Sequence, residues 1–259
     1  MTTSPEKTLK VEKLKIEIYG STEEMGAAAA ANTAAHIRNA IAENGEARVI
    51  FATGNSQFAF NEALKAHEIE WGKVTAFHMD EYAGMKDDHP ASFRKWIRER
   101  IEENFHPKAV HYLEGDAEDL EAEGRRYEAL IRESPIDLVC MGIGENGHIA
   151  FNDPPVADFN DTAWVKVVEL DRDCRMQQVG EGHFPSFDDV PTHALTLTVP
   201  ALIAPKALQV VVPEERKAVA VRKTLNDPIS EAHPATILRQ QSHATLYLDP
   251  ASASLIDED

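Results

Sequence analysis

Short apolar runs, rich in β-branched residues, alternate with longer helical patterns along most of the chain. The runs cover residues 14–19, 48–53, 74–79, 136–141, 164–168, 207–212 and 245–248, and each has the length of a strand. Helical patterns lie between them over residues 21–44, 57–67, 91–104, 116–134 and 217–225. Strands that alternate with helices predict an α/β fold, with a doubly wound, mostly parallel sheet and helices on both faces, as in Rossmann-like proteins.

No repeat, low-complexity tract or linker interrupts this pattern, so residues 1–259 are expected to form a single domain. No stretch approaches the roughly 20 apolar residues that cross a bilayer, and the first residues lack the apolar core of a secretion signal. Cys140 and Cys174 are the two cysteines, too few for a disulfide framework. We therefore expect a cytoplasmic protein with no membrane partner.

Acidic residues outnumber basic ones by 44 to 26, which gives a formal charge of −18. Such a surface repels nucleic acid, so no nucleic-acid partner is expected. The acidic runs, including the terminal residues 257–259, are interpreted as solvated surface. The eleven histidines show no HxxxH or HxH spacing, and no metal site is predicted. The sequence leaves open whether the chain forms a homo-oligomer.

Ligands of open α/β sheets bind outside the carboxyl ends of the strands, so polar residues that directly follow strands are the candidates. The first such group is Thr53, Gly54, Asn55 and Ser56. The helix that follows this turn has free amides at its start, and with the hydroxyls they are suited to binding a phosphate. A plain turn with Ser56 as the helix cap remains the alternative.

Two neighbouring carboxylates, Asp80 and Glu81, follow the strand at 74–79. One of them, when partly desolvated in a cleft, is suited to moving a proton on and off carbon. Both are candidates, Asp80 for catalysis and Glu81 for substrate binding. The alternative is a helix or loop cap, where Asp is common.

The third group is the glycine-rich segment 142–154, GIGENGHIAFNDP. Its glycines let the backbone approach a ligand closely, which makes Gly147 a candidate substrate contact. His148 lies in this turn beside Asn146 and shortly before Asp153, an arrangement suited to opening a sugar ring by proton transfer. A structural histidine is the alternative. Lys217, at the start of a later helix, is suited to binding a phosphate or to lying exposed on the surface.

Together these segments resemble the glucosamine-6-phosphate deaminase family, which is related to the 6-phosphogluconolactonases. The matching pieces run from about residue 48 to 248 and read ATGNS, FHMDEYAGMKDDHPASF, IDLVCMGIGENGHIAFNDP, ALTLTVPALI and PEERKAVAV. The resemblance implies an isomerase/hydrolase that turns glucosamine 6-phosphate into fructose 6-phosphate and ammonia without metal or cofactor. Still open are another hexosamine phosphate as substrate, a lactonase, and a sugar-phosphate sensor without turnover.

The resemblance also implies roles for single residues. Asp80 matches the proton acceptor, His148 the residue that protonates the ring oxygen, and Asn146 the group that orients this histidine. Asp153 occupies the place of a carboxylate, usually Glu, that assists ring opening. Residues 53–56 match the phosphate loop, and Lys217 matches its lysine partner.

Two departures from the family pattern concern the phosphate. The loop reads TGNSQ instead of a sequence close to TGGTP. The family's phosphate-binding arginine is expected shortly after the Cys174–Arg175 pair, but residues 176–184 contain none. The allosteric residues of the family are not matched, and no such regulation is predicted.

Overall fold

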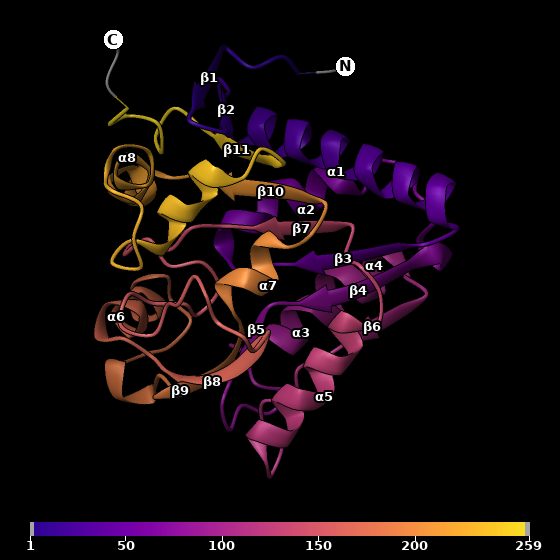
Figure 1. Ribbon diagram of the computed structural model, residues 1–259, viewed down its shortest axis with the longest axis vertical. Coiled ribbons are helices and arrows are strands. Elements are labelled where there is room, and N and C mark those ends of the chain that lie inside the picture. The colour runs from indigo at the N-terminus through magenta and orange to yellow at the C-terminus, as the bar shows by residue number, and fades with distance from the viewer. Residues whose placement is uncertain (1–2, 257–259) are drawn as a thin grey trace.

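Eight strands form the main sheet of the computed structural model, which describes residues 3–256. Its order is β1-β2-β11-β10-β7-β3-β4-β6 (Figure 1). All neighbours run parallel except β1, which is antiparallel to β2. In this order the strands are Lys7–Val11, Leu14–Ile18, Ala244–Leu248, Ala207–Val212, Leu138–Met141, Ala47–Phe51, Val74–His78 and Ala109–His111. The predicted α/β fold with a mostly parallel sheet is confirmed.

Helices cover both faces of this sheet, as predicted (Figure 1). The central strand β7 is apolar throughout because its side chains point alternately into two separate cores. Leu138 and Cys140 pack in one core, and Val139 and Met141 pack in the other. The first core lies under α1 (Thr22–Asn44), α2 (Phe58–Leu64) and α3 (Phe93–Ile97). The second lies under α5 (Leu120–Arg132), α7 (Val199–Ile203) and α8 (Ala218–Asn226).

A second, three-stranded antiparallel sheet was not predicted from the sequence. It consists of β5 (Asp80–Tyr82), β9 (His193–Leu197) and β8 (Val165–Glu169), in that order. The predicted strand at 164–168 is therefore real, but it belongs to this small sheet instead of the main one. Only Met79 separates β4 from β5, so the chain passes from one sheet to the other at the candidate site.

Other differences concern short or irregular elements. The predicted helix over 91–104 is interrupted by one π-helical turn at Arg98–Glu102, after which α4 (Glu103–Phe105) completes it. The prediction also missed α6 (Arg172–Gly180), whose residues lack a clear apolar stripe. Within residues 3–256, no helix has the length and apolar character needed to span a membrane. The acidic run 257–259 lies outside the described residues.

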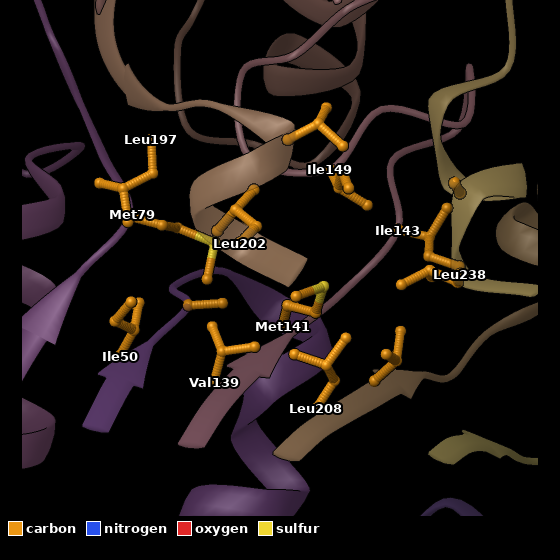
Figure 2. Close-up of a cluster of buried hydrophobic side chains, with 14 of the residues drawn as sticks. Ile50, Met79, Val139, Met141, Ile143, Ile149, Leu197, Leu202, Leu208 and Leu238 are labelled. Carbon is orange, nitrogen blue, oxygen red and sulfur yellow. The ribbon is translucent and has the colours of Figure 1, made fainter. Parts of the chain in front are cut away.

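The parallel arrangement places the carboxyl ends of four adjacent strands, β10, β7, β3 and β4, at one edge of the sheet. At these ends, apolar side chains of the strands, of the loops that follow them and of α7 form one buried cluster (Figure 2). Met79, which directly follows β4, Ile143, two residues after β7, and Leu202 of α7 all belong to it. The polar residues that follow these strands are thus attached to a buried, packed part of the structure.

Candidate active site

A pocket lies at this edge of the sheet and collects residues from all four strand ends. Residues 52–56 follow β3, Met79 and Asp80 follow β4, Gly142–Gly144 and His148 follow β7, and Lys217 follows β10. Seven of the predicted site residues therefore line one pocket: Thr53, Gly54, Asn55, Ser56, Asp80, His148 and Lys217. Asn146, Asp153, Gly147 and Glu81 are not among its lining residues.

His148 is held by two residues behind it. Its Nδ1 lies 2.7 Å from the Asn146 side-chain oxygen and 3.0 Å from Oδ1 of Asp153. Both neighbours are acceptors, since the Asn146 amide nitrogen donates to the same Asp153 oxygen at 3.1 Å. Nδ1 therefore carries a proton, and Nε2 is the ring nitrogen left for chemistry in the pocket. The arrangement fixes both the tautomer and the orientation of the ring.

Asp153 is fully buried and stays ionised all the same. Burial by itself raises its pKa, but the charge of His148 and hydrogen bonds from His148, Asn146 and the Asp171 amide outweigh it. The pKa of Asp153 therefore lies below its ordinary value. The Cys174 thiol also hydrogen-bonds Asp153, and burial followed by this negative charge raises the thiol pKa well above its usual range. Cys174 is thus a neutral donor.

Two glycines leave room for the rings of this site. A Cβ at Gly144 would overlap three ring atoms of His148, so the ring packs directly against the Gly144 backbone. Gly147 has a φ of 86°, which favours glycine, and a Cβ there would overlap the ring of His233. Gly147 therefore shapes the turn beside His148, and its predicted role as a substrate contact is not supported by its position.

Asp80 lines the pocket, and its pKa is shifted in the opposite direction to that of Asp153. Burial, followed by the charge of the adjacent Glu81, raises the pKa of Asp80 well above its ordinary value. A carboxylate with a raised pKa is a stronger base, which suits it to taking a proton from carbon. It remains 7% exposed, so a ligand can reach it.

His78 fixes the backbone at Asp80, although sequence reasoning did not select it. Burial lowers the pKa of His78 to about 3, so its imidazole is neutral. Nδ1 donates to the Asp80 carbonyl at 2.9 Å, and Nε2 accepts from the Leu113 amide at 2.9 Å. The Tyr127 hydroxyl also bonds both backbone groups of His78. These contacts set the position at which the chain enters β5.

The prediction that Glu81 binds substrate is corrected by the structure. Its side chain points away from the pocket and is completely buried. Its two oxygens accept from the Ser92 hydroxyl and from the backbone amides of Tyr82, Phe93 and Arg94. Side chains alternate along a strand, so Asp80 and Glu81 must face opposite sides of β5. Glu81 thus acts as the cap that holds the start of α3.

The polar turn after β3 and Lys217 line the same pocket. Ser56 does not cap the following helix; its hydroxyl accepts from the Gln57 side chain at 2.9 Å. Lys217 is buried, and its Nζ lies 3.5 Å from a carboxylate oxygen of Glu181. The pocket end that the sequence assigns to a phosphate therefore contains a lysine together with an acidic partner.

Comparison with known proteins identifies the relatives of this chain. The family model described as glucosamine-6-phosphate isomerases/6-phosphogluconolactonase matches residues 20–247. The chain belongs to this family. A glucosamine-6-phosphate deaminase from Exiguobacterium sp. is 35% identical over 203 residues, which are 78% of each chain. One from Bacillus cytotoxicus is 32% identical over 222 residues, covering 86% of this chain and 83% of the relative.

Solved structures of the family have the same fold. A monomeric glucosamine-6-phosphate deaminase is similar with a TM-score of 0.84 and 32% identity, and the match covers 93% of this chain and 99% of the other. A 6-phosphogluconolactonase from Shewanella baltica gives a TM-score of 0.76 at 17% identity, covering 93% and 98% of the two chains. The latter likeness concerns the fold alone.

This member of the family also carries pocket residues that sequence reasoning missed. They come from α6 and from the segment that follows it in the sequence, namely Gln177, Gln178, Glu181 and His183. A signal existed, because Asp171 caps α6 through its side chain, and Asp is a preferred helix cap. The helix itself has no apolar stripe that would have marked it.

One group near the site contains potential metal ligands. Donor atoms of His148, Asp153 and Cys174 all lie within 4.8 Å of one another, so a cation could be held between them. The hydrogen bonds of Asp153 with the other two account for this closeness without an ion.

Proposed function

We propose that the chain converts glucosamine 6-phosphate and water to fructose 6-phosphate and ammonia. The observation that carries the proposal is the pairing, in one pocket, of a carboxylate of raised pKa with a histidine held by a buried carboxylate. Asp80 is the base, and His148 with Asn146 and Asp153 is the proton donor. The relatives named glucosamine-6-phosphate deaminase support this substrate.

The reaction begins with the closed sugar ring. His148 donates a proton to the ring oxygen as the bond between C1 and this oxygen breaks, and the C1 hydroxyl gives its proton to a water molecule, which leaves the aldehyde. Asp153 stabilises the positive charge that His148 carries before donating. Asn146 keeps the ring aimed, because its oxygen accepts from Nδ1 and its amide donates to Asp153.

Asp80 then carries out the isomerisation. It takes the proton from C2 while the C1 oxygen gains a proton from water, which gives an enolamine. It then returns the proton to C1 as the amino group loses one to the hydroxide, which leaves a hydroxyl at C1 and an imine at C2. Water adds to this imine and ammonia leaves, so the ketone of fructose 6-phosphate forms and the second half is a hydrolysis. The raised pKa of Asp80 favours both steps, since the group must accept the proton and then give it back.

Release of ammonia from the purified chain tests this function. We expect release, together with fructose 6-phosphate in equal amount, from glucosamine 6-phosphate. Galactosamine 6-phosphate and unphosphorylated glucosamine serve as parallel substrates, and Asp80→Asn as the variant that should lose turnover while keeping the ligand. Absence of ammonia with every substrate would refute the proposal, as would normal turnover by the Asp80→Asn variant.

A further inference from the structure

The Glu181 carboxylate occupies a site built like a receptor for an anion. One oxygen accepts from the Gln177 side-chain amide at 2.9 Å and lies 3.5 Å from Nζ of Lys217. The same oxygen lies 3.6 Å from the Arg216 guanidinium, and the other oxygen lies 3.3 Å from Nε2 of His183. Burial alone would raise the pKa of Glu181, but His183, Lys217 and Gln177 lower it to about 2. The group is therefore a permanent anion.

This carboxylate lines the same pocket as the 53–56 turn. Glu181, His183, Gln177 and Lys217 all line the pocket with that turn. The Glu181 and Lys217 side chains are only 10% and 6% exposed, so solvent screens their attraction little. Lys217 is the one lysine or arginine among the described lining residues. A phosphate dianion beside Lys217 would therefore meet a buried negative charge already in place.

Glu181 lies in the hydrogen-bonded turn that ends α6. Helix α6 ends at Gly180, and Glu181 is followed by Gly182, whose φ of 81° favours glycine. A Cβ on Gly182 would meet nothing within 4 Å, and the Gly182 amide donates to the Val179 carbonyl at 3.0 Å. The Gln177 amide, in contrast, is anchored, because its oxygen accepts from the Glu145 amide at 2.9 Å. The Gln177 amide and the backbone at Glu181 are thus both held, so displacement of the carboxylate is a movement of the Glu181 side chain alone.

We propose that Lys217, Arg216, His183 and Gln177 form an anion subsite in which Glu181 stands in for the phosphate of the substrate, and from which the phosphate must displace it. The inference rests on the proposed function in that the anion is the phosphate of a sugar. Glu181 is then a specificity-determining residue. An anion too weak to displace it, such as a monoanionic carboxylate, is rejected, and the cations are never left unpaired in the empty pocket.

Binding of inorganic phosphate, measured by calorimetry, tests the inference without relying on turnover. Phosphate can bind only while the internal competitor leaves the site free, so the apparent affinity is the intrinsic affinity multiplied by the free fraction. We therefore expect Glu181→Gln to bind phosphate about tenfold more tightly than the unchanged chain. Glu181→Asp should also bind more tightly, because it keeps the charge but is one methylene too short to reach Lys217. Glu215→Gln, at an exposed neighbour of Arg216, loses the same charge and should bind as the unchanged chain does.

The variants separate displacement from a simple effect of charge. Tightening by Glu181→Gln but not by Glu181→Asp would refute displacement, since only the charge would matter. Weaker binding by either Glu181 variant would show that this carboxylate helps to hold the ligand, and would also overturn the proposal. Equal binding by all chains, or none by any, would exclude the subsite. Failure of the proposed function would instead appear as absent ammonia release, whatever the phosphate affinities are.

Discussion

Replacement of Gly144 by alanine provides a direct test of the His148 geometry. A Cβ at this position would place three atoms of the His148 ring well inside 3.0 Å, whereas ordinary contact begins at 3.4 Å. The ring must then move by roughly 1 Å, because the close-packed turn leaves no other way to relieve the overlap. Such a shift breaks at least one of the Nδ1 contacts at 2.7 and 3.0 Å. Misplacement of a catalytic group by 1 Å costs about 100-fold in rate.

The assay is kcat and KM for ammonia release from glucosamine 6-phosphate by Gly144→Ala. We expect kcat to fall about 100-fold while the melting temperature shows that the variant is folded. Gly72→Ala is the matched control, since a Cβ there meets nothing within 4 Å and the rate should not change. If Gly144→Ala kept kcat within about threefold, the position of the His148 ring would not be what limits the reaction.

Two further predictions concern the carboxylates of the site. Asp80→Asn should abolish turnover and raise the melting temperature at pH 7, because the raised pKa of Asp80 means that ionisation opposes folding as pH rises above its ordinary value. Each kcal/mol of added unfolding free energy raises the melting temperature by about 2–4 °C. Thermal melts at pH 7 and pH 4 should show a smaller increase at the lower pH. A lower melting temperature of the variant at pH 7 would contradict this prediction. Asp153→Asn should lower kcat for ammonia release about 100-fold. It should also lower the free energy of unfolding in urea by about 1–3 kcal/mol at pH 7. The lowered pKa of Asp153 means that its charge stabilises the fold until the pH falls through that pKa. A variant as stable as the unchanged chain would show that the charge is not needed.

The sequence could predict the main sheet, apart from its edge strands β1 and β6, and the place of the pocket, because both follow from local patterns. An apolar run such as 136–141 has to be a buried strand, and whatever follows a parallel strand lies at the ligand-binding edge. The residues after β3, β4, β7 and β10 could thus be brought together before any distance was known. The second sheet escaped this reasoning, since β5 is three residues long and its partner β9 lies more than 110 positions later.

Single side chains were harder to place than the turns that carry them. Asp80 and Glu81 are adjacent and chemically alike, and the choice between them depends on which face of β5 meets the pocket. Ser92 and the amides at the start of α3 settle that choice for Glu81, but nothing in the sequence pairs these groups. Glu181 shows the same limit, because its four partners come from α6, from the loop behind it and from the start of α8. Contacts between distant segments decide each case.

The two aspartates of the site show how one residue type can take two different roles. Asp80 and Asp153 are both almost completely buried, so burial alone would raise the pKa of each. Asp153 has His148, Asn146 and a backbone amide as partners, and these keep it charged. Asp80 has the charge of Glu81 beside it, which adds to the cost of ionisation. The neighbours of each aspartate shift the two pKa values in opposite directions, which makes Asp80 the base and Asp153 the charge stabiliser. The roles therefore follow from the neighbours and not from the aspartates themselves.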